Sequence, residues 1–362
     1  MKDIFDGFFN GKRVLVTGHT GFKGSWLCIW LRELGAEVVG VGLDPLTERD
    51  NFVLSGIGSS IMADIRADIR DLDAMKEIFA RYEPQIVFHL AAQPLVRLSY
   101  EMPVETYQTN VMGTVNVMEA IRTTGSVKVA VMVTTDKCYE NREIMRGYRE
   151  DDPFGGYDPY SSSKGACEIA IQSWRRSFFN PADYGVKHHV SLASVRAGNV
   201  IGGGDWAKDR IVPDCIRAIE AGRPVEIRSP RAVRPWEHVL EPLSGYLLLA
   251  QRMWEDPTGY CEGWNFGPEP NSVMTVWEVA SAIVSAFGRG SLKDVSTTDA
   301  PHEANLLLLD ITKAVTRLGW RPRLDAAGCA ALTADWYSRY AGENVYDLCV
   351  EEIDSFLSAD EK

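Results

Sequence analysis

Five side chains with acid, base or hydrogen-bonding chemistry fall within one short stretch of the sequence. Thr135, Asp136 and Lys137 follow an apolar run that predicts a buried strand, and Tyr160 and Lys164 begin a segment with helical spacing. Residues four apart share one face of a helix, so the Lys164 ammonium is expected beside the Tyr160 phenol. A nearby positive charge lowers the pKa of a phenol, which makes Tyr160 a candidate base near neutral pH. Thr135 is placed to hydrogen-bond the same substrate hydroxyl.

Each of these patterns also has an ordinary explanation. A Tyr and a Lys four residues apart often mark nothing more than a solvated helix face, and Asp136-Lys137 can be a solvated turn after a strand. The catalytic interpretation is favoured because the turn ends a predicted central strand and directly precedes the Tyr-Lys helix.

A glycine-rich loop upstream supplies the partner that this chemistry needs. Glycines stand at positions 18, 21 and 24, after a β-branched run and before a segment with helical spacing. Glycine permits the tight turn and lets backbone N–H groups approach a pyrophosphate, and the helix N-terminus favours the anion. The pattern predicts a dinucleotide site, with an ordinary strand–helix turn as the alternative. The loop residues expected to contact the cofactor are Gly18, Thr20, Gly21, Phe22 and Gly24.

Residues at the ends of the following strands complete the predicted cofactor site. Asp44 ends the second strand, where a carboxylate bonds ribose hydroxyls and repels a 2'-phosphate, so NAD is favoured over NADP. The alternative is that Asp44 only starts a turn before Pro45. Asp68 either reaches the adenine amine or caps the next helix. The further residues expected to line the crevice are Ile69, Leu90, Ala91 and Ala92.

Strands and helices must alternate in the first half of the chain to position these groups. Apolar runs predict strands at 12–17, 37–43, 61–64, 85–90, 127–133 and 190–195, and helical spacing recurs at 22–34, 71–82, 104–123 and 160–179. Such alternation predicts an α/β fold, a doubly wound parallel sheet of the Rossmann type with helices on both faces.

The pattern is less regular after residue 196. Helices are expected at 211–221, 239–254, 276–287, 311–318 and 326–340, with short strands at 225–228 and 306–309. No linker separates the halves. We therefore expect residues 1–196 to form mainly the NAD-binding domain and residues 197–362 mainly a smaller, mixed α/β substrate lobe interwoven with it. The acidic last dozen residues are expected to fray.

Composition narrows the class of partner. The net charge of -12 disfavours nucleic acid and anionic membranes. No apolar run reaches the roughly 20 residues of a membrane span, and the N-terminus does not resemble a signal peptide. The seven cysteines include no C-x-x-C pair, so we expect neither a metal site nor disulfides and place the protein in the cytoplasm.

The motifs together resemble a known family. The glycine loop, Val-Thr-Thr-Asp-Lys-Cys-Tyr (133–139) and Tyr-Ser-Ser-Ser-Lys (160–164) are similar to the extended short-chain dehydrogenase/reductase family, and within it to the nucleotide-sugar 4,6-dehydratases. The resemblance continues through the blocks at 19–24, 91–100, 197–210 and 234–246, and covers about residues 8–340.

The resemblance implies a three-step reaction on one bound NAD. Tyr160 would take the proton of the sugar 4-hydroxyl while NAD+ takes the C4 hydride, water would leave across C5 and C6, and the hydride would return to C6. By resemblance Asp136 is the acid for the C6 hydroxyl and Lys137 stands at the position of the C5 base. The broader family has Glu there, and a lysine is a base only if its pKa is depressed.

The resemblance also implies the substrate, CDP-glucose, although no residue can be shown to read the cytosine. A diphosphate favours Arg, and the stretch 196–234 holds eight Lys/Arg against five Asp/Glu. The residues expected to bind the substrate are Gln93, Arg97, Asn199, Arg210, Arg228 and Arg234. Family members usually pair through two helices, here 104–123 and 160–179, so a homodimer or dimer of dimers is expected, with Cys167 and Trp174 near the partner.

Four alternatives stay open at this stage. A nucleotide-sugar 4-epimerase would share Gly18, Tyr160 and Lys164 but needs no elimination acid. A 4,6-dehydratase for a different nucleotide sugar would share every motif. A dinucleotide-binding sensor or scaffold need not keep Tyr160 and Lys164, and an ordinary alcohol dehydrogenase would release NADH in each turnover.

Overall fold

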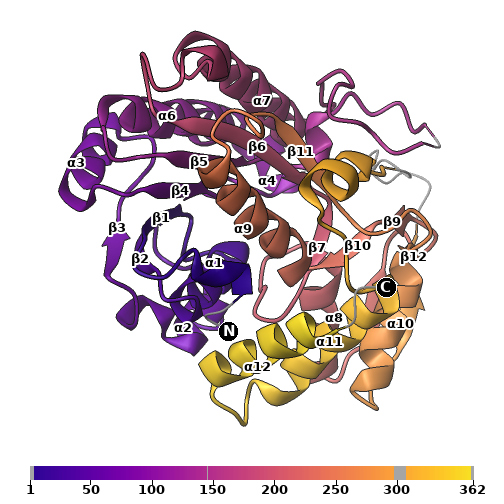
Figure 1. Ribbon diagram of the computed structural model, residues 1–362. Helices are drawn as coiled ribbons and strands as arrows, with labels where there is room; N and C mark the ends of the chain where they lie inside the picture. Colours follow the sequence, from indigo (N-terminus) through magenta and orange to yellow (C-terminus); the bar gives the residue numbers. More distant parts are fainter. Residues whose placement is uncertain (1–3, 145, 297–306, 360–362) are drawn as a thin grey trace.

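A seven-stranded parallel sheet forms the centre of the computed structural model, which describes residues 4–144, 146–296 and 307–359 (Figure 1). The strand order is β11-β6-β5-β4-β1-β2-β3, and every neighbouring pair is parallel. The order reverses between β1 and β4, as the doubly wound prediction requires. The strands are β1 (Arg13–Thr17), β2 (Glu37–Gly42), β3 (Ala63–Arg66), β4 (Ile86–His89), β5 (Val129–Val133), β6 (Ser191–Ala197) and β11 (Gly263–Phe266).

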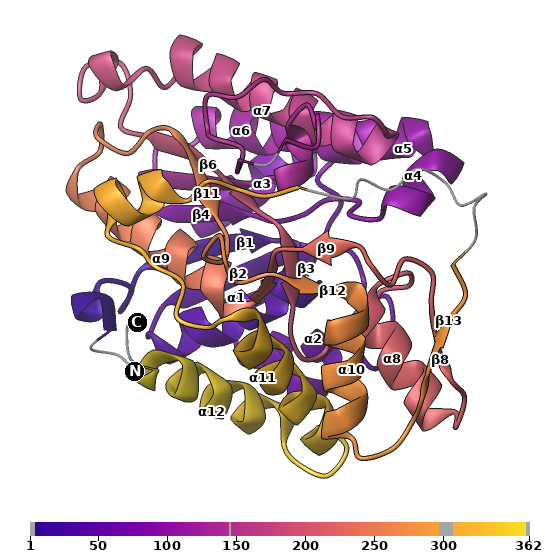
Figure 2. The same cartoon turned by 90° about the vertical axis from the view of Figure 1, so that its right-hand side faces the viewer.

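Helices cover both faces of this sheet. On β1, Val14 and Val16 join one hydrophobic cluster and Leu15 joins the other, because successive side chains of a strand point to opposite faces. Figure 2 shows α3, α6 and α7 on one face and α1 and α9 on the other. The first-half helices are α1 (Phe22–Glu33), α2 (Asn51–Ser55), α3 (Leu72–Tyr82), α4 (Val96–Glu101), α5 (Pro103–Tyr107), α6 (Gly113–Thr123) and α7 (Pro159–Ser177), with short turns η1 (Ile4–Gly7), η2 (Ile57–Ser59), η3 (Gln108–Met112), η4 (Asp136–Cys138) and η5 (Pro181–Asp183).

The second half of the chain adds to the sheet and builds a smaller lobe. β11 and α9 (Leu240–Glu255) complete the main sheet and its cover, although both follow residue 197. The lobe holds α8 (Ile211–Glu220), α10 (Val276–Ala286), η6 (Ala314–Leu318), α11 (Ala326–Arg339) and three two-stranded sheets. These sheets pair β7 (Asn199–Ile201) with β10 (Trp236–His238), β9 (Val233–Arg234) with β12 (Met274–Thr275), and β8 (Val225–Ile227) with β13 (Leu292–Asp294).

The helix expected at 104–123 is present: α5, the π-helical segment η3 and α6 follow one another without a break from 103 to 123. Two other sequence expectations were wrong. The strand expected at 306–309 is only a bridge between Leu309 and Tyr148, and residue 306 lies outside the described residues. The acidic end does not fray from residue 351: α12 (Val345–Ser358) buries Ile353 and Phe356 against the main core. The described residues contain no helix long and apolar enough to cross a bilayer.

Candidate active site

The glycine loop between β1 and α1 forms a cradle of bare backbone. Gly18 has φ +73°, and a Cβ there would lie 2.7 Å from the Ala91 nitrogen. A Cβ at Gly24 would lie 2.1 Å from the Gly18 carbonyl oxygen. The helix begins without a side-chain cap at Gly21, so its first N–H groups are not used by a capping side chain. This geometry fits the pyrophosphate of a dinucleotide.

The end of β4 is fixed beside this cradle by a buried chain of hydrogen bonds. The Thr17 hydroxyl lies 2.7 Å from His89 Nδ1, and His89 Nε2 lies 3.0 Å from the Thr114 hydroxyl. Burial lowers the pKa of His89 to about 3, so the ring is neutral. The Ala91 N–H donates to the Thr17 hydroxyl at 3.2 Å. Leu90, Ala91 and Ala92, all half-buried, therefore follow β4 at the sheet edge where the cofactor was expected.

The two predicted adenosine carboxylates are both held by arginines. Asp44 is 87% exposed and accepts from Arg66 Nε at 3.0 Å. Asp68 accepts from Arg70 Nη2 at 2.6 Å, and these hydrogen bonds lower the pKa of Asp68. Asp68 does not cap α3, because the cap is Asp71. Their contacts to a cofactor stay predictions.

The other predicted cofactor residues lie around the loop. Ile69 is buried beneath α6, and a Cβ on Gly113 would meet its Cδ1 at 2.4 Å. The Thr20 hydroxyl would lie 3.2 Å from a Cβ on Gly42 of β2. The Phe22 ring would lie 3.0 Å from a Cβ on Gly202, so it contacts the chain after β7.

His19 is a loop residue that the sequence analysis did not single out. Its buried ring packs on β2, where a Cβ at Gly40 would lie 2.2 Å from it, and Nε2 lies 2.7 Å from Asp64 Oδ1. Arg66 contacts the same carboxylate. The sequence signal was the pair of glycines, Gly40 and Gly42, in the predicted second strand. The structure shows that they leave room for the His19 ring.

The turn predicted to be catalytic, η4, follows β5 as expected, and it is called the catalytic turn below. The Thr135 hydroxyl donates to Asp136 Oδ1 at 2.8 Å and accepts from the Lys137 N–H at 3.4 Å. Asp136 is 3% exposed, and its Oδ2 is buried without a hydrogen-bond partner in the described part of the chain. Burial raises the pKa of Asp136, opposed by the charge of Lys137 and the bond from Thr135. A buried carboxyl that keeps its proton to higher pH is suited to be an acid.

Tyr160 and Lys164 lie in the first turns of α7, and both are buried. The expected direction of the Tyr160 shift was wrong: burial raises the pKa of the phenol, and a hydrogen bond with Thr135 only partly opposes it. The physical reason is that burial of the phenol disfavours its charged form, while the Lys164 ammonium is directed toward the Val133 carbonyl oxygen, 3.5 Å from its Nζ. Thr135 thus lies between the phenol and the Asp136 carboxyl, which brings together the residues predicted to handle oxidation and elimination.

A buried ion pair beneath this turn was missed at the sequence level. The Glu168 carboxylate on α7 accepts hydrogen bonds from Arg196 Nε at 2.8 Å and from Arg196 Nη2 at 3.0 Å. The same carboxylate accepts from the Thr134 hydroxyl at 2.5 Å and from Ser194 at 2.8 Å. Arg196 is 1% exposed, so it does not serve the anion-binding role considered for its segment. An arginine directly after the run predicted as a buried strand at 190–195 was the available signal.

The network continues to Asn265 on β11. Arg196 also bonds the Tyr139 hydroxyl, and that hydroxyl donates to Asn265 Oδ1 at 2.8 Å. Asn265 Nδ2 donates to the Tyr148 carbonyl at 2.8 Å. Asn265 therefore ties β11 to the segment that connects the catalytic turn with α7.

Two of the predicted substrate arginines meet at one carboxylate, and a third pairs with another carboxylate close by in the sequence. Arg97 and Arg228 both donate to Asp209 Oδ1 at 3.1 Å, although they belong to separate elements. Arg210 donates to Asp205 at 2.6 Å. The negative charge of Asp205 is the main cause that raises the pKa of Arg210, and Tyr160 makes a smaller contribution.

The remaining substrate candidates are Gln93, Asn199 and Arg234, and two of them make hydrogen bonds to neighbouring backbone. The Gln93 amide is used by its own loop: Nε2 donates to Leu95 O at 3.1 Å and Thr106 at 2.9 Å. Asn199 is half-buried on β7, and Arg234 on β9 donates to the Val233 carbonyl at 3.1 Å.

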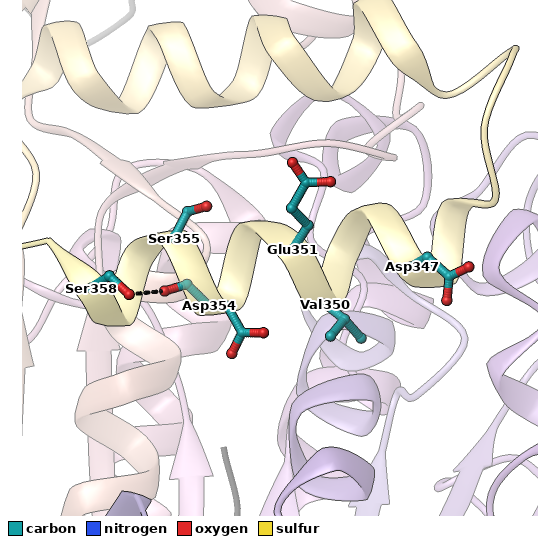
Figure 3. A pocket seen from close by; sticks show the side chains of 6 residues that line it. All are labelled: Asp347, Val350, Glu351, Asp354, Ser355 and Ser358. Carbon is teal, nitrogen blue, oxygen red and sulfur yellow. Dashed lines mark hydrogen bonds between the residues drawn. The ribbon is translucent and has the colours of Figure 1, made fainter.

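A separate hollow lies on the outer face of α12 (Figure 3). It is lined by Asp347, Val350, Glu351, Asp354, Ser355 and Ser358. Three carboxylates and no basic side chain line it, so it does not suit a diphosphate, and none of the groups described above reaches it.

Comparisons with known proteins agree with this geometry. A family model described as GDP-mannose 4,6 dehydratase matches residues 15–331. The CDP-glucose 4,6-dehydratase of Salmonella typhimurium is 49% identical over 98% of this chain and 99% of its own. The dTDP-glucose 4,6-dehydratase of Streptomyces venezuelae, crystallised with NAD, has TM-score 0.75 at 22% identity and covers 92% and 99% of the two chains. The UDP-glucose 4-epimerase of Thermus thermophilus in complex with NAD has TM-score 0.74 at 25% identity, covering 90% and 99%.

Proposed function

Because this chain belongs to the GDP-mannose 4,6-dehydratase family, we propose that it converts CDP-glucose to CDP-4-dehydro-6-deoxyglucose as an NAD-dependent hydro-lyase. The support for the nucleotide is the 49% identity to a CDP-glucose 4,6-dehydratase over nearly both chains. The relatives named for dTDP-glucose are at most 28% identical. The product is a precursor of deoxysugars, including those of bacterial surface polysaccharides such as O-antigen.

The cofactor, when bound, accepts the C4 hydride and later delivers it to C6. We propose that the loop at Gly18, Gly21 and Gly24 binds its pyrophosphate, and that Leu90, Ala91 and Ala92 border it at the end of β4. Tyr160 takes the C4 hydroxyl proton as its phenolate. Because burial alone raises the pKa of the phenol, this role requires the positive charge of bound NAD+ beside it. Lys164 holds the cofactor's ribose and the phenol in place. Asp44 and Asp68 bind the adenosine end of the cofactor. Each carboxylate then has to accept hydrogen bonds from the adenosine as well as from its arginine partner.

The single observation that carries a dehydratase rather than an epimerase is the state of Asp136. Its carboxyl is buried, its pKa is raised, and it is one hydroxyl away from the residue that handles the C4 proton. Asp136 gives its proton to the C6 hydroxyl as the C6–O bond breaks. The proton that Tyr160 gains at C4 balances the one that Asp136 loses, and the Thr135 hydroxyl lies between the two. Lys137 takes and returns the C5 proton.

Arginines from the lobe hold the diphosphate in this proposal. Arg97, Arg210 and Arg228 provide positive charge beside the catalytic turn, and Arg234, Asn199 and Gln93 complete the substrate contacts. Asp209 then has to release its two arginines when the anion enters.

We also propose a homodimer or dimer of dimers in the cytoplasm. Exposed apolar side chains on the two expected helices support pairing: Val104 is 69% exposed, Met112 52% and Ile169 61%. Cys167 is not at that surface, since it is 1% exposed and donates to the Asn110 carbonyl at 3.0 Å within the chain. The seven cysteines are buried and unpaired, as suits a reducing compartment.

Asp136→Asn is the variant that tests the proposal. We expect C4 oxidation to survive and elimination to fail, so bound NADH accumulates by near-ultraviolet absorbance while no dehydrated product forms. Thr123→Ser, a remote hydroxyl on α6, is the matched control and should behave as wild type. Equal loss of NADH formation and product would contradict the role of Asp136, and turnover of dTDP-glucose or GDP-mannose in preference to CDP-glucose would contradict the nucleotide.

A further inference from the structure

One partly exposed carboxylate joins two arginines from different parts of the chain. Asp209 Oδ1 accepts a hydrogen bond from Arg97 Nη1 at 3.1 Å, and it accepts two from Arg228, from Nη1 at 3.1 Å and from Nη2 at 3.2 Å. Arg97 lies in the first turn of α4, and Arg228 directly follows β8 of the lobe. The three side chains are 42–48% exposed, so a ligand from solvent can reach them.

The two guanidinium groups are close enough to need an anion between them. Both donate to one oxygen, so their Nη1 atoms lie no more than about 6 Å apart and the two charges repel each other when that oxygen is absent. In the described residues Asp209 is the one hydrogen-bond partner of either arginine side chain, which leaves most N–H donors of both groups unused. The neighbouring Arg210 is already paired with Asp205 at 2.6 Å. One negative charge thus stands where two positive charges meet.

A diphosphate matches this arrangement better than a carboxylate does. It carries about two negative charges and presents several oxygens, and planar guanidinium groups bind phosphate bidentately. Arg97 is also close to a residue proposed for catalysis: Ser99, buried on the same helix, accepts a hydrogen bond from the Tyr160 N–H at 3.1 Å. A diphosphate between Arg97 and Arg228 is therefore anchored on the helix that contacts Tyr160.

The backbone at Asp209 is strained, while the base of its loop is fixed. The φ angle of Asp209 is +62°, in the left-handed region that an aspartate enters at some cost. Arg217 of α8 holds the base of the loop by donating to the Trp206 carbonyl at 3.0 Å and to the Ala207 carbonyl at 3.2 Å. Lys208 and Asp209 follow this base and are exposed. The Asp209 carboxylate can therefore leave its arginines without disturbing the base of the loop.

We propose that Asp209 occupies the place of the substrate diphosphate when no sugar nucleotide is bound, and that it competes with the diphosphate for Arg97 and Arg228. This inference rests on the nucleotide-sugar substrate proposed above. The exchange replaces one ion partner by another and makes or breaks no covalent bond. Asp209 keeps the two arginines together before the substrate arrives. It also weakens the binding of every nucleoside diphosphate, because the ligand binds only those molecules in which Asp209 has left the arginines.

Removal of the Asp209 charge should tighten nucleotide binding. Asp209→Asn keeps the shape of the side chain and tolerates the left-handed backbone, but it no longer neutralises the arginines. An exposed ion pair is weak, so the dissociation constant of CDP should fall by only about 3–10-fold. A carboxylate that merely orients the two arginines for the substrate would give the opposite result, which is weaker binding of CDP by Asp209→Asn.

The experiment is a calorimetric titration of the NAD+-saturated protein with CDP, together with steady-state kinetics on CDP-glucose. Asp209→Asn should bind CDP more tightly than wild type, and KM for CDP-glucose should fall by a similar factor with no gain in kcat. Cytidine, which has no phosphate, should gain no affinity from the substitution. Asp183→Asn is the matched control, because it removes an exposed carboxylate paired with Lys187 beyond the end of α7 that is remote from Tyr160, and it should bind CDP as wild type does.

The gain in affinity must also disappear when the arginines are removed. In a background of Arg97→Gln with Arg228→Gln, the further change Asp209→Asn should leave the affinity for CDP unchanged. Weaker or unchanged CDP binding by Asp209→Asn, a gain that persists without the arginines, or no CDP binding by either protein would overturn the inference. If Asp209→Asn does not fold, Asp209→Gly, which suits the positive φ, decides by the same criteria. Tighter CDP binding by the variant without any dehydration of CDP-glucose by wild type would support the inference and contradict the proposed function.

Discussion

The ion pair between Glu168 and Arg196 makes a quantitative prediction about what stabilises the catalytic turn. The guanidinium gives Glu168 two charge-assisted hydrogen bonds in a site where both residues are at most 1% exposed. Arg196→Met removes both bonds and leaves a carboxylate facing only the Thr134 and Ser194 hydroxyls. We expect the free energy of unfolding to fall by about 3–5 kcal/mol, the cost of an uncompensated buried charge.

The double variant Glu168→Leu with Arg196→Met tests the cause. It leaves no charge in the core, so it should recover most of the loss, to within about 2 kcal/mol of wild type. Its activity should stay low, because Thr134 loses the acceptor that orients the residues after it. A matched control is Arg122→Met, which breaks an exposed pair with Glu119 on α6 and should cost less than about 1 kcal/mol.

Urea unfolding followed by intrinsic fluorescence measures five proteins: wild type, Arg196→Met, Glu168→Leu, their double variant and Arg122→Met. The reasoning is refuted if Arg196→Met costs no more than Arg122→Met. It is also refuted if the two core substitutions simply add, since that would mean that Glu168 and Arg196 do not depend on each other.

Three further substitutions test the site. Tyr160→Phe should lower kcat by about 10²–10⁴-fold while NAD+ still binds, since only the proton acceptor is removed; equal loss of NAD+ binding would contradict this. Gly18→Ala should abolish NAD+ binding by calorimetry, because its Cβ would lie 2.7 Å from a backbone nitrogen at the end of β4, whereas Gly125→Ala, with nothing within 4 Å, should not. Arg228→Gln should raise KM by about 10–100-fold with little change in kcat, and Arg252→Gln should not.

The fold could be predicted from the sequence wherever an element was long and regularly patterned. The alternation from β1 to α7 was anticipated within a few residues, because parallel strands and their helices leave clear apolar periods. The strand β11 has only four residues, Gly263–Phe266, and such a short run contains no period to detect. The helix α12 was missed because acidic residues dominate its exposed face, which lines the hollow shown in Figure 3. Its other face is apolar and buries Ile353 and Phe356 in the core.

The candidate site was chosen where residue types and spacing carry chemistry. The structure places the glycine loop after β1, the Thr135–Asp136 turn after β5 and the Tyr160–Lys164 pair at the start of α7, and the roles of these residues stay predictions. The sign of the Tyr160 pKa shift could not be predicted, because it depends on burial, which spacing does not reveal. Arg196 was missed for a related reason: its partner Glu168 is distant in sequence and meets it only in the folded chain.

The central claim is an internal redox cycle coupled to loss of water, and one labelled substrate tests it directly. CDP-glucose carrying deuterium at C4 is incubated with the protein and catalytic NAD+, and the product is analysed by mass spectrometry and NMR. The account predicts a product lighter than the substrate by one water, with the deuterium at C6 and no net NADH. A product of unchanged mass with inverted C4, or deuterium released in stoichiometric NADH, would contradict it.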